Sequence, residues 1–381
     1  MRFAGGGVRV GIFWRSEGRP ITTVLEKLPI VATLRSYRRS YLRPDLVTGV
    51  VLATMLLPQG MAYAELTGLP AVTGIYTTIA ALVGYSLFGP NRRLVLGPDS
   101  SLAPVIAAVV LPLAIGDQSS AVAYASMLSL LAGLVCIAAG YLRLGVVTEL
   151  LSKPIRIGYL NGIAVLIFVS QVPKALGFSV DVGSPFALIA DSVRGITEGQ
   201  TSLSAVAVAG GGVTVILLLN RLSRLRPGVV VAAALSIAVV VFFGVAVDTV
   251  GDIPSGLPAL TFPSSGFEEF PALLLGAVAV ALVSFADTGA LSTATAMKGG
   301  GQVDPNSEIK ALGAANLLSG VFQGFATSAS SSRTAVAMAV GSKTQVTGLV
   351  AAGGVVVLMI AFPDVIGQMP APTLAAIVMT A

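Results

Sequence analysis

Histidine is missing from this chain, and cysteine occurs once, at Cys136. Without histidine the chain lacks the commonest metal ligand and the side chain that most readily exchanges protons near neutral pH. A lone cysteine inside an apolar run builds no disulfide framework. The chain also contains no P-loop, no Ser/His/Asp set and no zinc-ligand spacing. The sequence therefore argues against three classes of protein: an enzyme, a metal-binding protein and a subunit of an ATP-driven pump.

Charged residues are scarce as well. They make up 11% of the 381 residues, against roughly a quarter in soluble domains. Hydrophobic residues make up 55%, and the mean hydropathy is +0.89. Apolar runs close to the ~20 residues of a membrane-crossing helix recur from residue 45 to the end, and they are continuous instead of alternating. The composition predicts an all-α polytopic membrane protein in contact with a lipid bilayer.

The expected spans are bounded by glycine, proline and polar residues. They cover 45–64, 70–88, 95–115, 121–141, 154–172, 202–220, 227–246, 270–296, 308–325, 328–342 and 344–362, with a twelfth starting near 371. Residues 1–44 form a basic segment ahead of one transmembrane domain over 45–381. Because the last residue falls inside the twelfth span, we expect about 11–12 spans in this chain.

The positions of lysine and arginine set the expected orientation, since inner loops carry an excess of both. With the N-terminus inside, only Lys174 and Arg194 fall in outside loops, and only Arg333 falls within the membrane. We expect a multi-pass protein of the inner (plasma) membrane with a cytoplasmic N-terminus. The net charge of +5 follows this topology and is not gathered on one surface with aromatic partners, which argues against nucleic acid as a partner.

Two spans are polar where a helix should cross the bilayer. The span at 95–115 opens with a Gly-Pro pair that cannot continue a helix, so we expect an extended segment and then a half-helix starting at Asp99 or Ser100. The span at 328–342 opens with a serine run, and we expect a second half-helix there, with Arg333 one residue into it. Irregular backbone at that depth is tolerated only where protein or a cavity covers it.

The polar residues of the two halves correspond in order. Gln59 in the first span and Asp287 in the eighth lie seven spans apart, as do Ser100 and Ser332. An odd number of spans reverses the direction of the chain, so equivalent elements enter from opposite sides. The pattern predicts an inverted-repeat transporter whose broken helices meet at the substrate.

Two half-helix N-termini that face each other near mid-bilayer would attract an anion. Each end presents free N–H groups and about half a positive charge. Hydroxyl donors could come from Ser100, Ser101, Ser331 and Ser332. The alternative is that these hydroxyls bond their own helix or join neighbouring helices, an interpretation that suits a single serine better than two clusters together.

Arg333 is expected to add positive potential beside the anion, since a cation at mid-bilayer costs about 2.5–3.5 kcal/mol and usually faces a cavity or a partner. The alternative is a structural ion pair with Asp99 or Asp287. Asp99 alternatively caps the half-helix, which is worth about 1 kcal/mol. Its carboxylate would repel an anion unless it were protonated or paired with Arg333.

Asp287 is an acid inside an otherwise apolar span. If it changes protonation during a transport cycle, it couples anion movement to protons or gates the site; the alternative is a permanently paired carboxylate. Gln59 follows Pro58 and would line the site or form an interhelical hydrogen bond. No cofactor is expected beyond a coupling ion, H⁺ or Na⁺.

Several motifs resemble one transporter family, SulP (sulfate permease, solute carrier family 26). They are Arg-Pro-Asp-Leu-Val-Thr-Gly at 43–49, Leu-Pro-Gln-Gly-Met-Ala-Tyr-Ala at 57–64, Leu-Pro-Ala-Val-Thr-Gly-Ile-Tyr at 69–76, Phe-Gly-Pro-Asn-Arg-Arg at 88–93, Ser-Arg-Thr-Ala-Val at 332–336 and Gly-Ser-Lys-Thr-Gln at 341–345. The resemblance covers about 43–381. By position, Gln59, Asp287, Ser332 and Arg333 match binding-site or near-site places of that family.

The resemblance implies two inverted seven-helix repeats in a UraA-like fold, with core spans at about 45–141 and 270–362. Gate spans would cover about 154–246 and 371–381, incomplete here, and the family's cytoplasmic STAS domain lies outside this chain. The substrate would be a small anion such as sulfate, bicarbonate or a dicarboxylate, moved by an elevator-like displacement of the core. A full-length form would be a possible homodimer. The alternatives are a proton-coupled nucleobase or neutral-solute carrier of the same fold, and an inactive truncated subunit.

Overall fold

The computed structural model describes residues 28–145, 153–180, 185–223, 227–254, 269–298 and 302–381, together with 256 and 260. Its elements in chain order are α2 (Pro29–Arg35), α3 (Arg39–Leu66), α4 (Ala71–Phe88), β1 (Leu96–Gly97), α5 (Ala103–Ala114), α6 (Gln118–Tyr141), α7 (Lys153–Leu176), α8 (Pro185–Thr197), α9 (Leu203–Leu222), α10 (Gly228–Phe243), α11 (Phe270–Lys298), α12 (Pro305–Val321), β2 (Ser328–Ala329), α13 (Ser331–Val340), α14 (Val346–Ala361), α15 (Pro363–Gly367) and α16 (Ala371–Met379). Six of the described helices are long and apolar enough to cross a membrane. The predicted helical membrane class is confirmed.

Most expected spans correspond to single helices, and the differences lie at their ends. α3 starts at Arg39 instead of residue 45 and runs through Pro58. α8 lies between the fifth and sixth expected spans, where the sequence pattern predicts no helix. Of the basic segment 1–44, residues 1–27 lie outside the described residues, and the remainder holds α2 and the first turns of α3.

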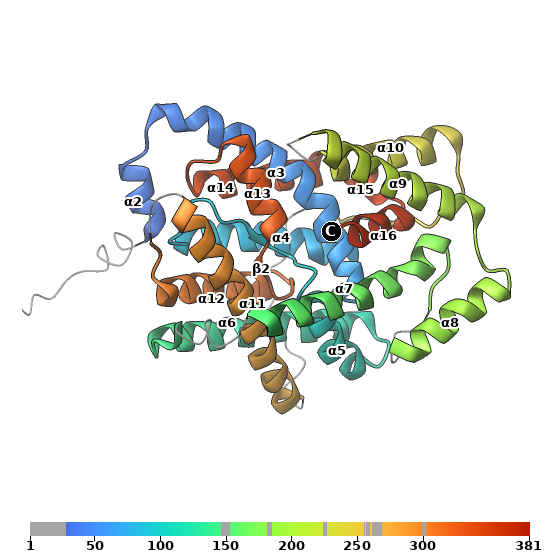
Figure 1. Cartoon of the computed structure of the whole chain (residues 1–381), viewed down its shortest axis with the longest axis horizontal. Coiled ribbons are helices and arrows are strands. Elements are labelled where there is room, and N and C mark those ends of the chain that lie inside the picture. The colour runs from blue at the N-terminus through green and yellow to red at the C-terminus, as the bar shows by residue number, and fades with distance from the viewer. Residues whose placement is uncertain are drawn as a thin grey trace, which may run out of the picture.

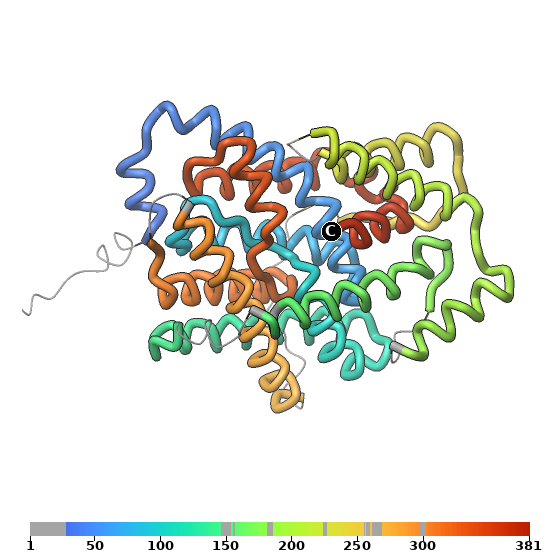
Figure 2. Tube along the Cα trace, viewed as in Figure 1, coloured from blue at the N-terminus to red at the C-terminus, as the bar shows by residue number. Residues whose placement is uncertain are grey.

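The helices form two groups, which the chain enters in alternation. The first group contains α3–α6 and α11–α14, and the second contains α7–α10 and α16. In Figures 1 and 2, α12, α13 and α14 lie on the left, whereas α8, α9 and α10 lie on the right. Elements far apart in sequence are therefore neighbours: α6 packs on α12, α3 packs on α14, and α16 packs on α7 and α9.

Small residues let the helices of the first group approach closely. At the crossing of α6 and α12, a Cβ on Gly133 would meet the Gly313 carbonyl oxygen at 2.8 Å, and a Cβ on Gly313 would meet that of Gly133 at 2.7 Å. Close backbone contact through glycine is typical of helix pairs in membranes. The two groups meet through an apolar layer in which Met61 and Ile75 of the first group share a cluster with Ile216 and Ile377 of the second. These contacts fix the frame that holds the two broken spans.

The two broken spans cross each other. β1 and β2 pair antiparallel, with Leu96 opposite Ala329 and Gly97 opposite Ser328. Both pairs are buried, so the ladder supplies bonds that these backbone groups could not obtain from lipid. Each extended segment leads into a half-helix, α5 after β1 and α13 after β2. The two predicted breaks are therefore present, and they lie side by side.

Candidate functional site

The two half-helices start differently from what the sequence predicts. α5 starts at Ala103 instead of Asp99 or Ser100. The reason is a preceding turn in which the Asp99 carbonyl accepts the N–H groups of Leu102 and Ala103, at 3.3 and 3.2 Å. The Asp99 carboxylate also accepts the Ser101 N–H at 3.2 Å. Asp99 therefore caps the turn that leads into α5.

α13 starts one residue earlier than expected. Its first residue is Ser331, so Arg333 is the third residue of the half-helix and not one residue into it. The boundary follows from Ser330, which has extended backbone angles of φ −110° and ψ 130° and makes no side-chain cap hydrogen bond. The first N–H groups of a helix have no partner within it. The α13 start thus lacks the capping that Asp99 gives the turn before the other half-helix.

A cavity lies where the two starts meet. It encloses about 970 Å³, counting the part open to solvent. Six of the eight predicted site residues line it: Asp99, Ser100, Ser101, Asp287, Ser331 and Ser332. Tyr63 of α3 and Leu160 of α7 line it as well. Residues of both helix groups therefore surround one polar space next to the strand crossing.

Arg333 lies behind this cavity and not in its wall. Its side chain is 1% exposed, and it donates hydrogen bonds to the carbonyl oxygens of Pro98 and Gly97. Its Nη2 lies 3.3 Å from Asp99 Oδ1 in an ion pair whose carboxylate side is 14% exposed. Within the described part of the chain, its Nε–H has no hydrogen-bond partner. The ion pair with Asp99, one of the sequence-based alternatives, is therefore present.

Asp287 joins the same cluster through a serine. The Ser101 hydroxyl lies 2.7 Å from Asp99 Oδ2 and 2.9 Å from Asp287 Oδ2. A hydroxyl carries one proton and donates it to one acceptor at a time. Ser101 thus connects the carboxylate beside Arg333 to the carboxylate of α11.

Gln59 is buried next to this region but does not line the cavity. It is 4% exposed, and its Oε1 has no hydrogen-bond partner among the described residues. An acceptor that is unpaired inside a protein usually has a water or ion as its partner. The interhelical hydrogen bond suggested as its alternative role is not formed by this oxygen.

Sequence reasoning did not single out two tyrosines and two threonines. Tyr63 lines the cavity, four residues after Gln59 on the same helix face, a spacing that could have indicated it. Tyr159 of α7 donates its hydroxyl to the Ser101 carbonyl at 3.2 Å and so joins the second group to the cluster. Thr334 accepts the Val95 N–H, and Thr288 accepts the Ala329 N–H. These two hydroxyls hold the extended segments in place.

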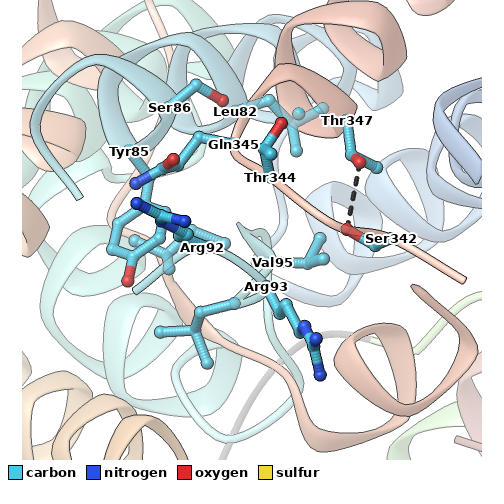
Figure 3. Close-up of a pocket in the computed structure, with 13 residues that line it drawn as sticks. Leu82, Tyr85, Ser86, Arg92, Arg93, Val95, Ser342, Thr344, Gln345 and Thr347 are labelled. Atoms are coloured by element: carbon cyan, nitrogen blue, oxygen red, sulfur yellow. Dashed lines mark hydrogen bonds between the residues drawn. The ribbon is translucent and has the colours of Figure 1, made fainter. Parts of the chain in front are cut away.

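A second cavity, of about 310 Å³, lies between the end of α4 and the start of α14 (Figure 3). Arg92 and Arg93 line it, together with Gln345 and with Ser342 and Thr347, whose hydroxyls lie 3.0 Å apart. None of the predicted site residues lines it.

Beside the second cavity lies a buried carboxylate. Asp45 accepts the backbone N–H of Lys343 at 2.7 Å and the hydroxyls of Thr344 and Thr347 at 2.6 and 3.0 Å. Its residue is fully buried. This network joins the start of α3 to the start of α14. Both carboxylate oxygens of Asp45 already accept hydrogen bonds from the protein, so Asp45 is not a candidate ligand-binding residue.

A further ion pair joins the two helix groups. Lys174, near the end of α7, lies 3.4 Å from Glu65 at the end of α3. Both line a cavity of about 1,060 Å³, counting its solvent-open part, along with Asp248. Two carboxylates and one amine make this space unsuited to an anion, so the polar cavity at the strand crossing is the candidate site.

Paired extended segments, each leading into a half-helix inside a bundle of membrane helices, are typical of a multi-pass membrane protein of the inverted-repeat transporter class. The family model of the sulfate permease family matches residues 42–381. The chain therefore belongs to the sulfate permease family, as the motifs indicated. Its relatives in that family are transporters and not enzymes.

One relative is a probable sulfate transporter of Mycobacterium tuberculosis, 37% identical over 95% of this chain and 65% of its own length. The chain thus spans less than two-thirds of that relative. Among solved structures, the murine solute carrier 26 family member A9 anion transporter in the inward-facing state matches with a TM-score of 0.88 and 22% identity, over 96% of this chain and 64% of the other. The transmembrane domain of a cyanobacterial bicarbonate transporter, BicA, matches with a TM-score of 0.82 and 23% identity, over 90% and 89%. These likenesses establish the fold.

Proposed function

We propose that this chain is the membrane part of a secondary transporter for a small anion such as sulfate, bicarbonate or a dicarboxylate. The observation that carries the proposal is Arg333, a fully buried guanidinium within the first turn of a half-helix that has no side-chain cap. Positive potential from the helix end and from the arginine adds up beside the serine-lined cavity. A neutral solute such as a nucleobase would not need this potential.

The first helix group acts as the core that carries the anion, and the second acts as the gate. The cavity is lined mainly by the first group, and the second reaches it through Leu160 and Tyr159. An elevator-like displacement of the core would break these few contacts and the Lys174–Glu65 ion pair. The N-terminus is cytoplasmic in this arrangement, as the distribution of lysine and arginine indicates.

Asp287 is the residue that we expect to couple the anion to H⁺ or Na⁺. It lines the cavity on α11 and shares a hydroxyl with Asp99. Asp287→Asn removes the charge while it keeps the size of the side chain. We expect this variant to change the dependence of transport on pH or on sodium more than it changes anion affinity.

The test is uptake of labelled sulfate, bicarbonate and oxalate into proteoliposomes, beside direct binding of the same anions to the purified chain, with uracil as the neutral solute. Binding of at least one anion, lost on Arg333→Ala, supports the proposal. Binding of uracil alone would show that the site belongs to a neutral-solute carrier.

A further inference from the structure

Cations gather without exposed acids where three segments of the chain meet. The segments are 28–45, 89–95 and 341–348, and the one acid within them, Asp45, is fully buried. Six of their cations are exposed and Arg93 is partly buried. We call these cations the basic surface; they are Arg35, Arg38, Arg39, Arg43, Arg92, Arg93 and Lys343.

Hydrogen bonds hold the three segments together. Gln345, just before α14, accepts the hydroxyl of Thr33 in α2 at 2.7 Å and donates to the Gly89 carbonyl oxygen at 2.8 Å. Asp45 of α3 accepts the Lys343 N–H at 2.7 Å. The side chains of Thr33, Asp45 and Gln345 are buried. The basic surface therefore rests on a fixed frame, which keeps cations from three parts of the chain next to one another.

The exposed face of α3 shows where this surface meets the bilayer. Arg39, Arg43, Leu46 and Val50 follow one another at spacings of four, three and four residues, so they share one face of the helix. All four are exposed, and the exposed fractions of Leu46 and Val50 are 43% and 57%. Outward apolar side chains on a membrane helix contact acyl chains, whereas arginines at the helix end reach the headgroups. The basic surface thus lies at the level of the lipid headgroups.

Two cations of the basic surface are placed to hold a phosphate. Arg92 and Arg93 line the second cavity (Figure 3), and within the described residues neither forms an ion pair. The carboxylate of Asp45 does not neutralise them directly, because it accepts its hydrogen bonds from the residues around the start of α14. The planar donors of arginine suit a phosphate group.

We propose that the basic surface binds the headgroup phosphates of anionic lipids, and that Arg92 and Arg93 hold one phosphate at the mouth of the second cavity. In the proposed orientation these lipids belong to the cytoplasmic leaflet, whose anionic headgroups attract basic segments next to a membrane helix. The inference goes beyond the proposed anion site, since no residue of the basic surface lines the cavity at the strand crossing.

The experiment compares two lipids with the same acyl chains, anionic phosphatidylglycerol and zwitterionic phosphatidylcholine. Both are added in equal amounts to the purified chain in detergent, and native mass spectrometry measures the ratio in which they stay bound. For the wild type we expect a preference for phosphatidylglycerol that falls as the ionic strength rises. A cation near a bilayer surface contributes about fivefold, so Arg92→Gln combined with Arg93→Gln should lower the preference by about tenfold or more.

The matched control removes the same charge outside the basic surface. Arg143 follows the end of α6 and Arg221 lies in the last turn of α9, and both are exposed. Arg143→Gln combined with Arg221→Gln should leave the lipid preference unchanged. Glycerol phosphate carries the headgroup phosphate without acyl chains, and at the same concentration as the lipid it should not displace phosphatidylglycerol.

Three outcomes would overturn the inference. They are a wild type without a preference for phosphatidylglycerol, equal losses in the two double variants, and displacement of the lipid by glycerol phosphate, which would make the surface a site for free phosphates. Sulfate binding tests the proposed function separately, and it should be the same in the wild type and in both double variants.

Discussion

Two helices of the first group that follow one another in the chain start in opposite ways. α12 starts behind Asp304, whose carboxylate accepts the N–H groups of Asn306 and Ser307 at 3.2 and 3.1 Å. α13 starts behind Ser330, whose side chain makes no cap hydrogen bond. The first helix end is closed by its own side chain, whereas the second is left open beside a cavity.

This difference distinguishes helix starts that a carboxylate caps from the helix start that we propose binds the anion. α6 resembles α12, since Asp117 caps it through Ser119 and Ser120. α5 is intermediate, because Asp99 caps the preceding turn and not the helix itself. A carboxylate cap neutralises the positive end of a helix. Only an end without such a cap keeps its potential for a ligand, and among these four helices only α13 has neither a capping side chain nor a carboxylate-capped turn before it.

The largest effect is expected from removing the cation of the open end. Arg333→Ala leaves Asp99, which is 14% exposed, without its cationic partner, a change that costs less folding free energy than the about 3–5 kcal/mol of a fully buried pair. Adding Asp99→Asn removes the stranded charge and should recover most of that loss. Sulfate binding should stay at least about tenfold weaker in the double variant than in Asp99→Asn alone, a difference of about 1.4 kcal/mol.

Unfolding can be followed with a thiol-reactive dye, because the only cysteine, Cys136, is 2% exposed in the folded chain. Arg333→Lys is the matched control, since it keeps the charge but loses the planar set of donors. A double variant that binds sulfate as well as Asp99→Asn would show that the guanidinium contributes nothing to the site.

A smaller effect is expected when the open end is given the cap of the closed one. Ser330→Asp places a carboxylate at the start of α13, where it takes up N–H groups and cancels part of the helix dipole. We expect sulfate affinity to fall by about tenfold, or 1.4 kcal/mol. Ser330→Asn is the control, because asparagine caps without a charge, and its effect should be less than about threefold.

Thermal unfolding of both variants should match or exceed that of the wild type, since each gains a cap. Equal losses of affinity in Ser330→Asp and Ser330→Asn would mean that the charge at this helix end has no influence on the anion.

The breaks in the third and tenth spans were predictable because proline and serine runs are strong local signals. Gly97 and Pro98 cannot continue a helix, and the structure places β1 there. The order of polar residues also predicted that the two breaks belong together, which the antiparallel pairing of β1 and β2 confirms. Local chemistry therefore sufficed to locate the crossing.

What the sequence left open are choices between partners that are distant in the chain. Arg333 could pair with Asp99 or Asp287, and only the packing of α13 against β1 decides for Asp99. The direction of its side chain, behind the cavity instead of into it, depends on the same packing. The starts of the two half-helices are also misplaced by one to four residues in the sequence analysis, because the turn at Asp99 and the extended Ser330 are backbone features without a residue signature.

The smallest effect is expected at the closed end itself. Asp304→Ala opens the start of α12 and should lower the free energy of unfolding by no more than about 1 kcal/mol, with sulfate affinity unchanged because Asp304 does not line the cavity. The Ser307 hydroxyl and nearby N–H groups hold the pKa of Asp304 below its usual value. A lowered pKa means that the stabilisation is complete above the unfolded-state value of about 3.9 and is lost as the pH falls through the lower folded-state value. The difference between Asp304→Ala and the wild type should thus be constant near neutral pH and shrink only below about pH 4, whereas a loss of sulfate affinity in this variant would remove the distinction between closed and open helix ends.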